Sequence, residues 1–201
     1  MVKRMTSEDK ERIRAAVQAA ERTTAGEIRV SIVPHSARPN LWLGGLVTIA
    51  VSAAVFAWRG HEAWGLTSGI DVVIALGIGT ALGALLGWLP ALPRSARSVR
   101  RRAEREFVRL GIAQTAGRTG VLLLLSMAER RAVLLADRAI NEKVAQETWD
   151  KVIGDLVASI GQEKTADGLI QAVGSVGRIL SEHFPRRPDD VNELPDDVAG
   201  G

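Results

Sequence analysis

The sequence has no cysteine and no tyrosine, and only three histidines among 201 residues. The absence of cysteine excludes disulfides and thiolate metal ligands, which fits a reducing compartment. No apolar segment follows the basic residues at the start, so no secretory signal is expected. Gly111, Gly117 and Gly120 lack the spacing and the following Lys-Ser/Thr of a phosphate-binding loop. A nucleotide-binding loop of that kind is therefore excluded.

Two long apolar runs stand out against a charged remainder. Leu41 to Trp58 is 18 residues without a charge, and Val72 to Leu92 is 21 residues without a charge. A hydrocarbon core of ~30 Å takes roughly 17–25 helical residues to cross. The runs therefore predict a transmembrane helical hairpin over residues 41–92, with spans at 41–58 and 72–92.

Arginine is distributed unevenly about these runs. The flanks outside the hairpin carry ten arginines, whereas the segment between the runs carries only Arg59. Positive residues mark the cytoplasmic side of membrane helices. We therefore expect an integral protein of the bacterial inner membrane, with both termini cytoplasmic.

Glycines recur every fourth residue in the second run, at Gly79, Gly83 and Gly87. Small residues at this spacing lie on one helix face and allow another helix to approach closely. The expected neighbour is the first run, with Ala50 and Ala54, or another copy of the protein.

The other residues alternate between helical and strand patterns. Three short runs are rich in β-branched residues or leucine and predict strands, at residues 27–33, 120–126 and 132–136. The last two are expected to form a β-hairpin at the centre of the sheet. Apolar residues at helical spacing predict helices over 6–20, 99–110, 141–160 and 165–184, with Thr6 and Asn141 as N-caps.

Together these elements predict an α/β fold. A small central β-sheet is expected between helices on both faces, because one face is too small to bury all the apolar stripes. The expected organisation is a first half at 1–40, the membrane hairpin at 41–92, a second half at 93–185 and a polar acidic tail at 186–201. Within the tail, residues 192–195 are expected to dock on the domain, with binding to a partner as the alternative.

The second run is followed by a dense arginine cluster. Because a predicted membrane helix ends just before it, we expect contact with the bilayer and its anionic headgroups, at ~1 kcal/mol per basic residue, rather than with nucleic acid. The residues of this predicted membrane surface are Arg94, Arg97, Arg100, Arg101 and Arg102.

Several strings of the sequence resemble the TPM-domain family, in particular its small bacterial membrane members with a two-helix insertion. They are ERTTAGEIRV, the segment from Arg101 to Ile140, the helix around Trp149, HFP, and NELPDDV. The resemblance implies an α/β sandwich and LemA-type membrane proteins as partners. For plant members it implies a proposed acid phosphatase activity. The sequence departs from the family pattern at Met5-Thr6-Ser7 and at Arg118-Thr119, where acidic residues are expected.

A few polar residues at predicted strand ends are candidates for chemistry. Glu27 and Asp137 are candidates to share a sheet edge and, with Glu129, to ligate a hard cation such as Ca²⁺ or Mg²⁺. Arg118 would offset phosphoryl charge, and Thr119 is a weak candidate nucleophile. The alternative is that each is a solvated strand-end or turn residue. Convergence of these groups in one cleft would favour an enzyme, and scatter would not.

Two functions remain open at this point. The first is a non-enzymatic interaction or scaffold module that faces the cytoplasm and maintains the envelope. The second is a membrane-tethered, metal-dependent acid phosphatase that uses Glu27 and Asp137. The absence of a recognisable catalytic constellation favours the first.

Overall fold

The computed structural model describes residues 5–36, 41–60, 76–83, 96–162, 164–186, 188 and 192–199. The chain divides into two compact units. The first combines Met1–Ser36 with Ser95–Gly201, and the second is Ala37–Arg94.

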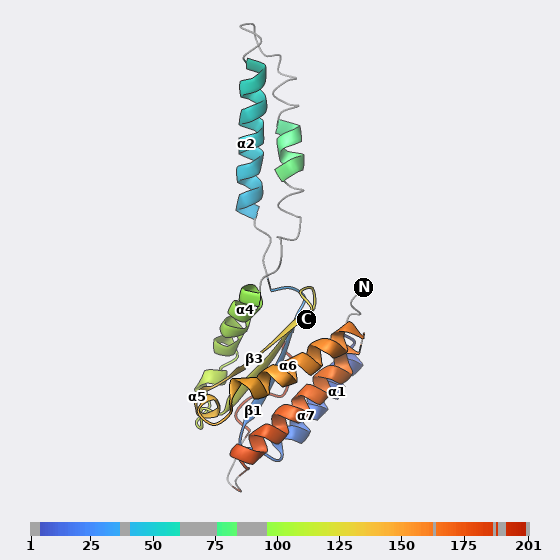
Figure 1. Cartoon of the computed structure of the whole chain (residues 1–201), viewed down its shortest axis with the longest axis vertical. Helices are drawn as coiled ribbons and strands as arrows, with labels where there is room; N and C mark the ends of the chain where they lie inside the picture. Colours follow the sequence, from blue (N-terminus) through green and yellow to red (C-terminus); the bar gives the residue numbers. More distant parts are fainter. Residues whose placement is uncertain are drawn as a thin grey trace. The chain divides into compact units, whose positions relative to one another are not determined.

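The first unit is built on a three-stranded sheet (Figure 1). β1 (Glu27–Val33) runs parallel to β2 (Gly120–Ser126), and β2 runs antiparallel to β3 (Arg131–Ala136). The order β1-β2-β3 places β2 alone at the centre and β3 at an edge, which corrects the prediction that the whole hairpin is central. β2 is buried along its full length, because helices cover both faces of the sheet, and this explains its uniform run of Val and Leu.

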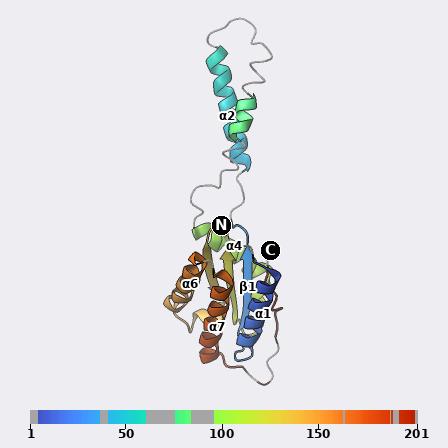
Figure 2. The same ribbon diagram turned by 90° about the vertical axis from the view of Figure 1, so that its right-hand side faces the viewer.

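Helices α1 (Ser7–Glu21), α6 (Gln146–Gly161) and α7 (Thr165–His183) pack on one face of the sheet (Figure 2). Ile13, Trp149 and Leu180 belong to the larger core on this side. The opposite face carries α4 (Ala96–Arg109) and the short η1 (Ile112–Gln114), with a smaller core around Val99, Ile112 and Leu124. The predicted α/β sandwich, with helices on both faces of a small sheet, is confirmed.

The helix starts follow local capping chemistry. Thr6 and Asp9 form the two reciprocal bonds of a capping box at the start of α1, as expected for the predicted cap. The predicted helix over 141–160 is wrong at its start. Asp137 instead caps a one-turn helix, α5 (Arg138–Asn141), and α6 begins only at Gln146. The amide of Asn141 donates to the Ala136 carbonyl and caps no helix.

The acidic tail forms an isolated β-bridge at the free edge of β1. Ala199 forms a parallel bridge with Ser31. The Ile32 N–H donates to the Ala199 carbonyl at 2.8 Å, and the Ala199 N–H donates to the Val30 carbonyl at 2.9 Å. The docking predicted for residues 192–195 is also seen, since the Glu193 N–H donates to Glu27 Oε1 at 3.0 Å. The edge of the sheet is covered by the chain itself.

The second unit contains α2 (Leu41–Gly60) and the helical residues 76–83. Gly79 is buried, and a Cβ built on it would lie 2.3 Å from the Ser52 Oγ and 2.9 Å from the Thr48 carbonyl oxygen. The structure therefore places Gly79 against α2, at Thr48 and Ser52, while Ala50 and Ala54 are exposed. Gly83 is also buried, and Gly87 lies outside the described residues.

The structure contradicts the predicted membrane localisation. Among the described residues, no helix combines the length and the apolar character that a membrane span requires. The prediction of an integral inner-membrane protein with cytoplasmic termini is therefore wrong, and the predicted transmembrane hairpin is unsupported.

Candidate functional site

A polar cleft opens where α1 ends and β1 begins, beside the docked tail. Its volume is about 300 Å³. It combines three carboxyl groups with two guanidinium groups and two amides, so its chemistry is that of a charged binding site rather than of an apolar cavity. The lining residues are Gln18, Glu21, Arg22, Thr24, Gly26, Glu27, Arg186, Asn192 and Asp196.

Glu21 occupies the last turn of α1 and faces β1. Its Oε1 accepts a hydrogen bond of 2.9 Å from the Ile28 N–H, at the edge of the sheet. Burial raises the pKa of Glu21 to about 8. The bond from Ile28 opposes this rise, while the charges of Glu27 and Asp196 add to it. Near pH 7 the protonated carboxyl is therefore the favoured form.

Asp196 lines the same cleft as Glu21, and the two carboxyl groups interact electrostatically. Its two oxygens accept bonds from the amides of Gln18, at 2.8 Å, and Asn192, at 2.7 Å. Burial by itself would raise the pKa of Asp196, but these hydrogen bonds hold it below its usual value. The pair therefore consists of a protonated Glu21 and an ionised Asp196.

Glu27 opens β1 and holds the tail from the other side. It is 6 % exposed, and its Oε1 accepts a 3.0 Å bond from the Glu193 N–H. The Glu193 carboxylate in turn accepts the Ala116 N–H at 3.0 Å. Glu27 therefore acts as an acceptor for the backbone of the docked tail.

Arg29 is the unusual cation of this region. It lies on β1 two residues after Glu27 and is 5 % exposed. Within the described part of the chain, its Nε and Nη1 atoms have no hydrogen-bond partner. Burial lowers the pKa of Arg29, and the charges of Asp197 and Asp196 oppose that effect. The tail thus supplies Arg29 with charge compensation but not with a full set of acceptors.

The predicted catalytic residues Arg118, Thr119 and Asp137 are found at one end of the sheet. The Asp137 N–H donates to the Gly120 carbonyl, and Arg118 Nη1 lies 3.7 Å from Asp137 Oδ2. Each group is already engaged. Asp137 Oδ1 caps α5, Arg118 donates to the Ala113 carbonyl, and the Thr119 hydroxyl donates to the Ala25 carbonyl at 3.0 Å.

The predicted metal ligands Glu27, Asp137 and Glu129 do not converge. Glu27 is level with Asp137, but β2 lies between their strands, which separates the backbones by about 10 Å. Glu129 is in the turn after β2, about 20 Å away along the strand, where it accepts bonds from the Ser126 hydroxyl and the Ser36 N–H. In the described residues no group of three or more acidic or histidine side chains is arranged to hold a metal ion. The predicted set does not fit Ca²⁺ or Mg²⁺.

The arginines of the predicted membrane surface lie on α4, except Arg94, which lies outside the described residues. Arg97, Arg100 and Arg101 are exposed. Arg102 is half-buried and pairs with the buried Glu106 at 2.9 Å. Contact of the exposed arginines with anionic headgroups stays a prediction.

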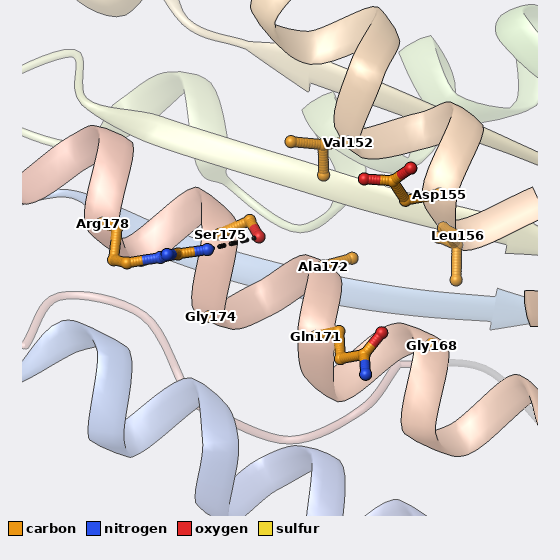
Figure 3. Close-up of a pocket in the computed structure, with 9 residues that line it drawn as sticks. All are labelled: Val152, Asp155, Leu156, Gly168, Gln171, Ala172, Gly174, Ser175 and Arg178. Atoms are coloured by element: carbon orange, nitrogen blue, oxygen red, sulfur yellow. Dashed lines mark hydrogen bonds between the residues drawn. The ribbon is translucent and has the colours of Figure 1, made fainter.

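A second cleft, of about 490 Å³, lies between α6 and α7 (Figure 3). Its floor is apolar at Leu156 and Ala172. Arg178 donates to the Ser175 hydroxyl at 3.1 Å, on α7, while Asp155 projects from α6 (Figure 3). These polar groups belong to different parts of the rim and do not converge on one point, so we assign no chemistry to this cleft.

Sequence reasoning did not single out Glu21, Arg29 or Asp196. The position of Arg29 in the sequence could have pointed to this site. A charged residue within the alternating apolar pattern of β1 must either face water or pair with carboxylates. The NELPDDV segment supplies those carboxylates, but only the fold brings it to β1.

These features define an α/β sandwich domain with a carboxylate-lined cleft and a self-covered sheet edge. Residues 90–179 match the family model of the TPM domain. The chain is also similar to the NMR structure of the BA42 protein from the psychrophilic bacterium Bizionia argentinensis, with 21% identity and a TM-score of 0.63. That similarity covers 99% of this chain and 97% of the other, and at this identity it shows the fold alone. A comparison with curated proteins finds no match.

Proposed function

We propose that this TPM-like domain is a protein-interaction module rather than a hydrolase. The observation that carries the proposal is that the chain's own tail is bound at the edge of β1. There an extended segment lies along the strand, and Glu27 and the β1 backbone bind its main chain. Binding of an extended segment at a sheet edge is a general mode of peptide recognition.

The candidate catalytic groups support the same conclusion. Hydrolysis of a phosphoester needs a nucleophile or a metal-activated water, together with cations at the phosphoryl oxygens. The Thr119 hydroxyl and the Asp137 carboxylate instead form hydrogen bonds that hold the β1 and α5 backbones. Hydrogen bonds of this kind to the backbone are the contacts expected of structural residues.

The test combines a binding and an activity measurement on the purified full chain. A LemA-type protein, the partner that the family resemblance implies, should bind saturably in biolayer interferometry. Hydrolysis of p-nitrophenyl phosphate with Mg²⁺ or Ca²⁺ should not exceed that of a mock preparation. Metal-dependent turnover that Asp137→Asn abolishes would show that the domain is an enzyme.

A metal-dependent phosphatase is the second candidate. The specific observation in its favour is the approach of Arg118 to Asp137, 3.7 Å apart, which places a cation beside a carboxylate at the sheet end. Under this alternative Glu27→Gln and Asp137→Asn would each lower turnover, whereas Glu129→Gln, at the opposite end of the sheet, would not.

A further inference from the structure

The edge of β1 is covered by a minimal contact. Among the tail residues that the structure describes, Ala199 alone forms backbone bonds with β1: its carbonyl accepts the Ile32 N–H, and its N–H donates to the Val30 carbonyl. The Ile28 N–H also points away from β2, and it donates to the Glu21 side chain rather than to a neighbouring strand. An edge of this kind presents main-chain donors and acceptors that suit any extended segment.

Side chains of the tail show what chemistry this edge accepts. Leu194 packs on the core beneath α4, and Val198 packs on the larger core. Three of the eight described residues between 192 and 199 are acidic, namely Glu193, Asp196 and Asp197. The occupant of the edge is thus extended, acidic and anchored by two apolar side chains.

The tail leaves the buried cation incompletely satisfied. Asp197 compensates the charge of Arg29, but its side chain is 73% exposed and lies 3.7 Å from the Arg14 Nε. A guanidinium that is almost fully buried is best stabilised by a carboxylate that accepts two parallel bonds. In the described part of the chain, the Nε and Nη1 atoms of Arg29 lack acceptors. A carboxylate that fits this edge better than the tail would supply them.

We propose that the edge of β1 is a docking site for an extended acidic segment of a partner protein. The segment pairs parallel to β1 in place of residues 192–199 and delivers a carboxylate to Arg29. This inference rests on the proposed role as an interaction module and names the surface and the chemistry of the partner. The tail is then an internal competitor, which a partner must displace.

The experiment weakens the tail in the full chain and offers its sequence in trans. Ala199→Pro removes the N–H that bonds Val30, whereas the matched control Ala199→Gly keeps it. The probe is a fluorescent peptide NELPDDVA, and its amide analogue NQLPNNVA tests the need for charge. Binding is followed by fluorescence anisotropy, and release of the tail by hydrogen exchange at the Ile32 amide.

A tethered segment competes at an effective concentration in the millimolar range, so the wild type should bind the peptide weakly. The Ala199→Pro chain should bind it at least about tenfold more tightly than the wild type or Ala199→Gly, and the amide analogue should bind about tenfold less tightly than NELPDDVA. In the Ala199→Pro chain the Ile32 amide should exchange faster, and the peptide should restore its protection.

Asp197→Asn is a second variant that should weaken docking of the tail. Its side chain is exposed, so the substitution should not disturb folding. If neither variant raises the affinity for NELPDDVA, or if the amide analogue binds equally well, the docking site is wrong. Saturable binding of a LemA-type protein that is indifferent to Ala199→Pro would also reject this site while leaving the interaction module intact. Metal-dependent hydrolysis alongside tight peptide binding would support the docking site and reject the role as a non-enzymatic module.

Discussion

Glu21 and Asp196, 175 residues apart in the sequence, line the same cleft as two interacting carboxyl groups. They belong to the end of α1 and to the docked tail, and the negative charge of Asp196 helps to raise the pKa of Glu21. The contact makes the tail part of the folded domain, and it makes the stability of that region depend on pH.

The first prediction concerns this pH dependence. The pKa of Glu21 rises from 4.5 to about 8 on folding, so the folded chain holds a proton that the unfolded chain releases. The stability from this group is complete below pH 4.5 and is lost as the pH rises through 8. Urea unfolding should show lower stability at pH 8.5 than at pH 5. At ~1.4 kcal/mol per pKa unit the shift corresponds to roughly 4 kcal/mol over this pH range, and solvent screening of the partly exposed group should reduce the loss to about 1–3 kcal/mol.

Glu21→Gln is the variant that isolates this effect. Glutamine keeps an acceptor for the Ile28 N–H and a donor for Asp196, but it does not titrate. The variant should lose most of the slope between pH 5 and pH 8.5, whereas Glu182→Gln, at an exposed position of α7, should keep it. An unchanged slope in Glu21→Gln would show that the proton resides elsewhere.

The second prediction concerns the close approach of α1 and α7. A Cβ on Gly177 would lie 2.6 Å from the Ala20 Cβ and 3.2 Å from its Cα, so Gly177→Ala must force the helices apart. Overpacking of this kind costs ~1–3 kcal/mol. Gly174→Ala on the same helix meets nothing within 4 Å and should gain ~0.5–1 kcal/mol from helix propensity. Chemical unfolding of both variants measures the difference, and equal stabilities would contradict the packing.

The third prediction concerns the second unit by itself. Gly79→Ala would clash with Ser52 and the Thr48 carbonyl of α2, while Gly77→Ala meets nothing within 4 Å. We expect faster amide exchange along α2 in Gly79→Ala, corresponding to a local loss of ~1–3 kcal/mol. The Gly77→Ala control should exchange like the wild type. If both variants behave alike, α2 and residues 76–83 are not in contact through Gly79.

The fourth prediction concerns the only buried carboxylate of α4 in the described structure. Glu106 is 3 % exposed and pairs with Arg102 at 2.9 Å and Arg109 at 2.5 Å. Glu106→Gln keeps the shape but leaves two arginines without their counter-charge, which should cost about 1–3 kcal/mol. Glu104→Gln removes only an exposed ion pair with Arg100 and should cost below ~0.5 kcal/mol. Thermal unfolding distinguishes the two, and similar midpoints would argue against a structural role for Glu106.

Much of the secondary structure followed from local patterns. The strands at 27–33 and 120–126 match the predicted ranges, because alternation and uniform apolar runs are properties of a few adjacent residues. The start of α6 was missed, since Asp137 ends β3 with its own cap and restarts the chain as α5. The predicted membrane spans are not supported, since no helix among the described residues has both the length and the apolar character of a span.

The sequence by itself determined the α/β class, the three strands, the amphipathic helices and the exclusion of cysteine chemistry, because each depends on composition or on short-range periodicity. Only the tertiary structure decided which charges meet. It separated Glu129 from Glu27 and Asp137 along the sheet, buried Arg29, and brought Asp196 and Ala199 to an edge formed more than 160 residues earlier. The physical reason is that a carboxylate's role depends on its neighbours in space, and no local pattern encodes contacts across such separations.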